Sequence, residues 1–165
     1  MKRVIGLVSG LIVSLSLANA QIWTFDTLMN GSNVNPPNDS PATGRAFGTY
    51  NQATNVLQIT MQASGFESDT FAGDIHRAPA GQNGPLVFRW TNQSGNPRIW
   101  FSENTFNLTE EQEADFLAGL WYVDIHTNNF QRGEIRGQLN PVPEPGSLLA
   151  LTAGALGFWF RRRRS

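Results

Sequence analysis

Alternation of apolar and polar residues is the clearest pattern in the middle of the chain. Apolar side chains occupy every second position from Leu57 to Ala63, with polar side chains between them. A period of two is that of a β-strand with one buried and one solvated face. Further β-prone runs, separated by segments containing glycine or proline, lie at Ile22–Thr27, Thr43–Tyr50, Phe71–His76, Pro85–Trp90, Arg98–Phe101, Trp121–His126 and Glu134–Leu139. These runs predict a succession of short strands.

One segment has the pattern of a helix instead. Thr109 stands three positions before Gln112, which is the spacing of a capping box. Glu110 and Glu111 follow the cap, where negative charge favours a helix N-terminus, and Gly119 is a typical stop. Many short strands with a single helix predict an all-β fold, either an antiparallel sandwich or a Greek-key barrel with one short helix.

The two ends of the chain differ from the middle. Residues 1–20 have a basic start, an apolar run and an Ala-x-Ala site that ends at Ala20, which is the pattern of a signal peptide. At the other end, a proline-rich linker at 141–145 precedes the uncharged stretch Gly146–Phe160 and four arginines. A helix of that length covers about 22 Å, less than the hydrocarbon core of about 30 Å. We therefore expect transient membrane insertion of 146–165, with the arginines cytoplasmic and the domain at 21–140 outside.

The C-terminal segment resembles a known sorting signal. Val142, Pro143, Glu144 and Pro145, followed by an apolar stretch and an arginine cluster, are similar to the PEP-CTERM signal of Gram-negative bacteria. The resemblance implies that an exosortase, a membrane protease-transpeptidase, removes the tail. It also implies export through the inner membrane to the cell surface or an extracellular matrix. The alternative interpretation is an ordinary tail anchor.

Charge and cysteine content narrow the classes of function. The whole chain has a net charge of −1, but residues 21–140 contain 6 arginines, no lysine and 12 acidic residues, which gives −6. Because an acidic domain repels phosphate backbones, we expect no nucleic-acid partner. The chain contains no cysteine, which excludes disulfides, thiolate metal sites and cysteine nucleophiles.

A short repeat supplies the main candidate chemistry. Asp74-Ile75-His76 recurs as Asp124-Ile125-His126, and in a strand the aspartate and histidine of each copy share one face. If the two copies are adjacent, Asp74, His76, Asp124 and His126 form a candidate metal site, because imidazole with carboxylate suits zinc or copper. We expect instead that each imidazole binds a backbone carbonyl and fixes a loop, so that no metal is bound, and the metal site is the alternative.

The polar residues outside the Asp-Ile-His repeat give weaker indications of a functional site. Glu134 and Arg136 share a strand face, and an ion pair between them is expected. No serine has a convincing base partner, and no glycine-rich loop suited to a phosphate is present in the sequence. We therefore expect no catalytic residues, no enzyme activity and no cofactor.

Several segments of the middle resemble the CHRD (chordin-type) domain. They are Pro36-Pro37, Asp74-Ile75-His76, Asn83-Gly84-Pro85-Leu86-Val87-Phe88, Trp121-Tyr122-Val123-Asp124-Ile125-His126-Thr127 and Gly133-Glu134-Ile135-Arg136-Gly137-Gln138-Leu139. The resemblance covers about residues 30–139 and implies an extracellular domain that carries no catalytic activity. We expect a non-catalytic binding or structural domain whose partner is an extracellular protein or polysaccharide. The alternative is a metal-binding protein or metal-dependent enzyme that uses His76 and His126.

Overall fold

The computed structural model describes residues 21–144, and the predicted signal peptide, hydrophobic segment and arginine tail lie outside that range. The elements are β1 (Ile22–Asn30), η1 (Gly31–Asn33), β2 (Thr43–Asn51), β3 (Val56–Ser64), β4 (Thr70–Arg77), β5 (Leu86–Trp90), β6 (Trp100–Asn107), α1 (Glu110–Leu117), β7 (Trp121–Thr127), β8 (Ile135–Gln138) and β9 (Val142–Pro143). The strands pair antiparallel in one sheet that curls into a half-barrel. The predicted class, all-β and antiparallel with one short helix, is confirmed.

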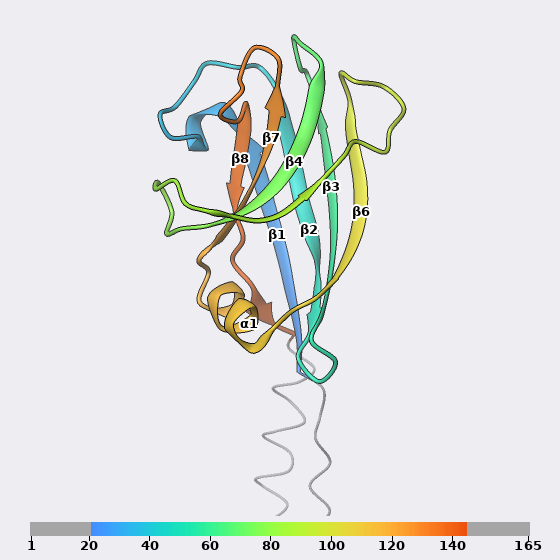
Figure 1. Cartoon of the computed structure of the whole chain (residues 1–165), viewed down its shortest axis with the longest axis vertical. Coiled ribbons are helices and arrows are strands. Elements are labelled where there is room, and N and C mark those ends of the chain that lie inside the picture. Colours follow the sequence, from blue (N-terminus) through green and yellow to red (C-terminus); the bar gives the residue numbers. More distant parts are fainter. Residues whose placement is uncertain (1–20, 145–165) are drawn as a thin grey trace, which may run out of the picture.

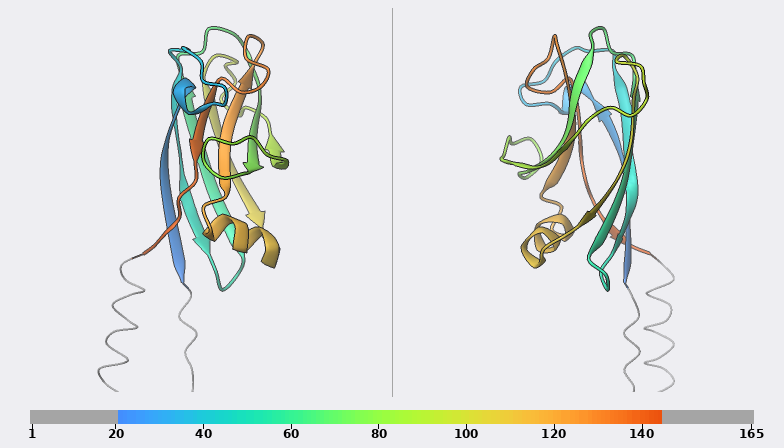
Figure 2. Two further views of the ribbon diagram at one scale, coloured as in Figure 1. Left: turned by 90° about the vertical axis from the view of Figure 1, so that its left-hand side faces the viewer. Right: turned by 45° about the vertical axis from the view of Figure 1, so that its right-hand side comes forward.

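The sheet has the strand order β5-β4-β7-β8-β1-β2-β3-β6, and β9 adds to β1. One half of this order forms one wall of the half-barrel and the other half forms the opposite wall, with the core between them (Figures 1 and 2). The two end strands meet through side chains: Phe88 of β5 stacks on Phe106 of β6 at 4.2 Å between centroids. Trp90 of β5 also donates a hydrogen bond to the Ser102 hydroxyl of β6 at 2.8 Å. Side-chain contacts therefore join the edges that the backbone leaves open.

The strongest sequence patterns have the predicted structure. In β3, Leu57 and Met61 are fully buried, whereas Gln58 between them is exposed. In α1, the Thr109 hydroxyl accepts the Gln112 amide, and the Gln112 side chain accepts the Thr109 amide, which completes the capping box. The helix covers the end of the half-barrel at which residues 21 and 144 also lie (Figure 1).

Two segments differ from the sequence-based prediction. The strand expected at Arg98–Phe101 begins at Trp100 and extends to Asn107, through a polar stretch that pairs with β3 at the edge of the sheet. The expected linker is extended, but its residues Val142–Pro143 pair with β1 as β9, and the Glu144 amide donates to the Ile22 carbonyl. The sorting motif therefore begins on the folded domain.

Gly73 of β4 is expected to tolerate no side chain. A Cβ atom built there would lie 2.5 Å from Trp100 Cζ2 in the core, closer than real contacts allow. We expect Gly73→Ala to lower the free energy of unfolding by about 1–3 kcal/mol, as overpacked cores do, in urea unfolding measured by fluorescence. The cost should shrink in a Trp100→Phe background, which removes the ring atoms concerned. An equal cost in both backgrounds would show that the ring is not the obstacle.

Candidate metal centre

The two Asp-Ile-His segments lie side by side in the sheet. Strands β4 and β7 pair antiparallel with Asp74 directly opposite Asp124. Because successive side chains of a strand point to opposite faces, each aspartate shares a face with its histidine, while Ile75 and Ile125 are buried in the core. The repeat thus becomes a local twofold arrangement, in which the two histidines flank the aspartate pair from opposite ends.

One atom from each of the four side chains lies within 4.8 Å of the other three. His126 Nε2 is 3.0 Å from Asp74 Oδ2 and 3.2 Å from Asp124 Oδ1. His76 Nε2 is 3.4 Å and 3.8 Å from the same two oxygens. A tetrahedral zinc ion with bonds of about 2.0–2.1 Å holds its ligand atoms about 3.3 Å apart. The four nitrogen–oxygen separations in the cluster, 3.0–3.8 Å, are therefore close to the ligand–ligand spacing around one metal ion.

Backbone carbonyls orient both imidazole rings. His76 Nδ1 is 3.0 Å from the Gly84 carbonyl oxygen, and His126 Nδ1 is 2.9 Å from that of Gln131. A carbonyl can only accept, so each Nδ1 carries a proton, and in the neutral ring Nε2 holds a lone pair. Within residues 21–144, neither buried Nε2 makes a hydrogen bond of acceptable geometry, although the carboxylates are near. The expected role of fixing a loop and the alternative role of metal ligand are thus compatible.

Residues that the sequence analysis did not select support the cluster. The Arg89 guanidinium donates two hydrogen bonds to Asp74, at 2.8 Å and 2.6 Å. The Tyr122 ring stacks on His76 at 5.2 Å between centroids, and its hydroxyl accepts the Gly84 amide at 3.2 Å. Arg89 lies directly opposite Asp74 in the β4–β5 hairpin, so the hairpin register was the signal that could have identified it.

The two facing carboxylates are buried, and their charges lower the stability of the fold. Asp74 is 0% exposed and Asp124 is 5% exposed, and like charges directly opposite in a sheet destabilise it. Burial opposes a charge on His126, but the Asp124 and Asp74 carboxylates outweigh it and raise the pKa of that imidazole to about 10. The pKa of His76 is also raised against its burial, chiefly by Asp74. Burial likewise opposes ionisation of Asp74, yet Arg89 and the two imidazoles hold its pKa well below the ordinary value. The centre of the cluster therefore favours positive charge, from protons or from a metal cation.

The expected ion pair between Glu134 and Arg136 does not form. The Glu134 carboxylate instead accepts hydrogen bonds from the hydroxyls of Ser40 and Thr127. The Arg136 guanidinium lies over the Tyr122 ring, 3.3 Å from its centroid. Both side chains are buried, and their partners lie on other segments: Ser40 on the loop before β2, and Tyr122 and Thr127 on β7.

The predicted processing residues fall partly within the described structure. Val142 and Pro143 form β9 and Glu144 follows it, whereas Ala20 and Pro145 lie outside the described residues. None of the helices within residues 21–144 has the length and apolar character of a membrane-spanning segment.

Two known families match consecutive parts of the chain. The family model of the CHRD domain matches residues 25–139, and that of the PEP-CTERM protein-sorting motif matches residues 141–164. No curated protein matches the chain. The sorting motif implies export through the inner membrane of a Gram-negative bacterium and processing by an exosortase at the C-terminus. The two matches confirm both resemblances, and the chain belongs to the CHRD domain family as an exported protein with a C-terminal PEP-CTERM sorting motif.

Proposed function

We propose that this chain is a cell-surface or matrix protein whose CHRD domain is a non-catalytic binding module built around one divalent transition-metal ion. Asp74, His76, Asp124 and His126 are the proposed ligands. The observation that carries the proposal is the spacing of their four ligand atoms, which lie around one point at 3.0–3.8 Å between nitrogens and oxygens. The sorting motif places such a domain outside the inner membrane.

The donor set favours zinc. Two imidazole nitrogens and two carboxylate oxygens form a mixed shell that suits zinc or copper, and zinc is the usual ion where four protein ligands close the shell. Calcium needs six to eight oxygen ligands, and magnesium needs an octahedral oxygen shell. Only two carboxylates lie in the cluster, so zinc satisfies the donor set better than either hard cation.

A closed shell argues for binding rather than catalysis. Structural zinc sites have four protein ligands, whereas catalytic sites keep one position for water or substrate. Here four protein ligands are available, and three of them, Asp74, Asp124 and His126, are buried. The competing function, a metal-dependent enzyme that uses His76 and His126, requires a fifth position. Hydrolytic or redox turnover by the zinc-loaded chain, lost in both His→Ala variants, would establish that alternative.

Zinc titration of the purified full chain, followed by calorimetry, tests the site. We expect one zinc ion per chain, and we expect Asp124→Asn to weaken binding at least tenfold because the amide supplies a weaker ligand than a carboxylate. Asp26→Asn is the matched control, since Asp26 lies in an exposed ion pair with Arg45 outside the cluster. Zinc binding that is absent, or that is equal in the Asp124→Asn and wild-type chains, would refute the proposed site.

A further inference from the structure

Arg136 of β8 is a buried cation that forms no salt bridge among residues 21–144. Four of the six arginines of the domain pair with carboxylates, namely Arg45, Arg77, Arg89 and Arg98. Arg136 is only 3% exposed. Its Nη1 donates to the Asn83 side chain at 3.2 Å, and its Nη2 has no hydrogen-bond partner among residues 21–144. The Tyr122 ring and Asp124, opposite Arg136 in the β7–β8 register, offset part of the cost of burying this charge, but Nη2 is left without an acceptor, so the guanidinium is suited to a bound anion.

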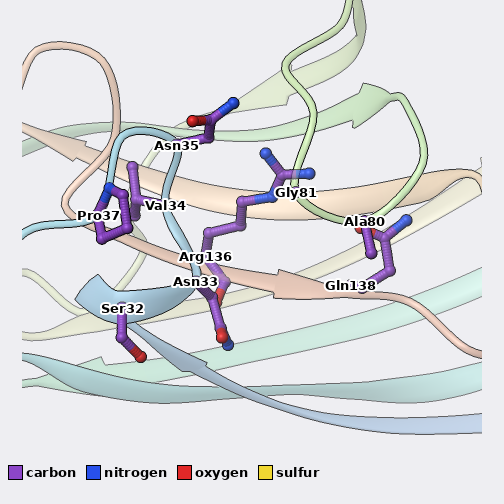
Figure 3. Close-up of a pocket in the computed structure, with 9 residues that line it drawn as sticks. All are labelled: Ser32, Asn33, Val34, Asn35, Pro37, Ala80, Gly81, Arg136 and Gln138. Atoms are coloured by element: carbon purple, nitrogen blue, oxygen red, sulfur yellow. The ribbon is translucent and has the colours of Figure 1, made fainter.

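Arg136 lines a pocket of about 340 Å³ between the loop after η1, the segment at 80–81 and β8 (Figure 3). Gln138 lines the same pocket, and its amide nitrogen already donates to the carbonyls of Ala78 and Gly119. Its buried Oε1 has no partner among the described residues. The wall of the pocket therefore contains one unmatched donor and one unmatched acceptor. A ligand bearing both an anionic oxygen and a hydroxyl group would satisfy them once the two side chains turn toward it.

A second pocket of about 450 Å³ adjoins the first, and both are lined by Val34, Asn35 and Pro37. It contains Phe130 and Arg132, and Arg132 is the other arginine that forms no ion pair among residues 21–144. No aspartate or glutamate lines either pocket, although the domain contains 12 acidic residues. Both unpaired arginines thus lie in adjacent pockets from which carboxylates are excluded.

We propose that these two pockets bind consecutive sugar acids of an acidic polysaccharide. In the first pocket, a sugar carboxylate pairs with the Arg136 guanidinium while a neighbouring hydroxyl donates to Gln138 Oε1. In the second, the next carboxylate pairs with Arg132 and the sugar ring lies on Phe130, an apolar surface suited to its C–H face. A carboxylate matches the planar guanidinium fork, and one negative charge per sugar matches one arginine per pocket. This inference goes beyond metal binding and does not depend on it.

The position of the pockets suits a ligand outside the cell. Residues 21 and 144 lie at one end of the half-barrel, and the loops at 31–38 and 128–133 lie at the other end (Figure 1). The pockets that these loops line are therefore at the end of the domain opposite the one where the C-terminal sorting motif begins.

Calorimetry with trigalacturonate tests the proposal on the full chain, without added zinc or calcium. We expect binding that weakens at least tenfold when the trimer is methyl-esterified, since the ester removes the charge and keeps the sugar. Arg136→Gln and Arg132→Gln should each weaken binding at least fivefold, whereas Arg98→Gln, which removes the same charge outside the pockets, should not. Circular dichroism would show whether each variant is folded.

A second variant keeps the test decisive if Arg136→Gln does not fold. Ala80 is exposed and lines the first pocket, so Ala80→Phe should fill the pocket and weaken binding, while Ala53→Phe in a distant exposed turn should not. Equal binding of the ester and the acid, or full binding by Ala80→Phe, would overturn the proposal. If inorganic phosphate binds as tightly as trigalacturonate, the pockets form a general anion site and the sugar-acid proposal is overturned. Trigalacturonate binding by His126→Ala separates this inference from the proposed metal function.

Discussion

Zinc at a thousandfold excess over its dissociation constant is expected to raise the Tm of the metal-free chain by about 10–20 °C. A ligand that binds only the native state at that excess stabilises it by about 4 kcal/mol, and a domain of this size gains a few degrees per kcal/mol. The condition of native-state binding is met because Asp74 and Asp124 are distant in the sequence. They become neighbours only when β4 pairs with β7, so the unfolded chain offers no preformed site.

The physical reason for so large a shift is the charge at the centre of the cluster. Two buried carboxylates face each other across the strand pair, and without metal Arg89, Arg136 and the two imidazoles offset their repulsion. A divalent cation coordinated by both oxygens offsets it directly and also engages both Nε2 atoms, which lack hydrogen bonds of their own.

Differential scanning calorimetry of the chelator-treated chain, before and after zinc addition, measures this effect. His126→Ala should abolish the zinc-dependent rise, whereas Asp26→Asn should keep it in full. A wild-type Tm that does not respond to zinc would show that the cluster is an ion-pair network of carboxylates and imidazolium groups. In that case the raised pKa of His126 means that its imidazole is protonated and paired with the two carboxylates at neutral pH.

The strand and helix patterns predicted the fold because they reflect burial that is local in sequence. Leu57 to Ala63 alternates because one face of β3 meets the core, and the Thr109–Gln112 capping box needs no residue from elsewhere. The polar end of β6, from Ser102 to Asn107, has no such signal. It is a strand because β3 supplies its hydrogen bonds at the edge of the sheet, which a local pattern does not encode.

The site was predictable in composition but not in geometry. The Asp-x-His repeat fixes which side chains share a face, and it identified all four members of the cluster. Their distances depend on the β4–β7 register and on loop carbonyls, at Gly84 and Gln131, that orient the rings. For Arg136 the shared strand face led to a wrong prediction. Its expected ion-pair partner Glu134 is two residues away, but the Glu134 carboxylate accepts hydrogen bonds from the Ser40 and Thr127 hydroxyls instead.

Removal of the C-terminal tail is the second large effect that we expect. In the native host, the mature cell-surface protein should begin near Gln21 and lack Arg161–Arg164, with release from the membrane following the cut. The arginines should stop transfer because moving a guanidinium to the centre of the hydrocarbon costs about 2.5–3.5 kcal/mol per residue on insertion scales. The sorting motif at residues 141–164 then marks the segment for an exosortase rather than for permanent anchoring.

The structure adds a constraint on where the cut falls. Trp23 and Thr24 of β1 pair with β9, and the Glu144 amide is bound to the Ile22 carbonyl. A protease needs an extended, unpaired backbone, so the folded domain protects the chain up to Glu144, and the severed bond should lie beyond it. The mature protein is then expected to retain Val142–Pro143 as the closing strand of the sheet.

Intact-mass spectrometry of the surface protein measures both the loss of the tail and the cut position. Glu144→Ala should leave the full tail in place and the protein in the membrane fraction, whereas Glu67→Ala, an exposed glutamate outside the motif, should be processed normally. A surface species that still contains Arg161–Arg164 would identify the segment as a plain anchor. A mature mass that ends before Val142 would show that β9 leaves β1 before cleavage, because the paired strand cannot enter a protease while its backbone is bound to β1.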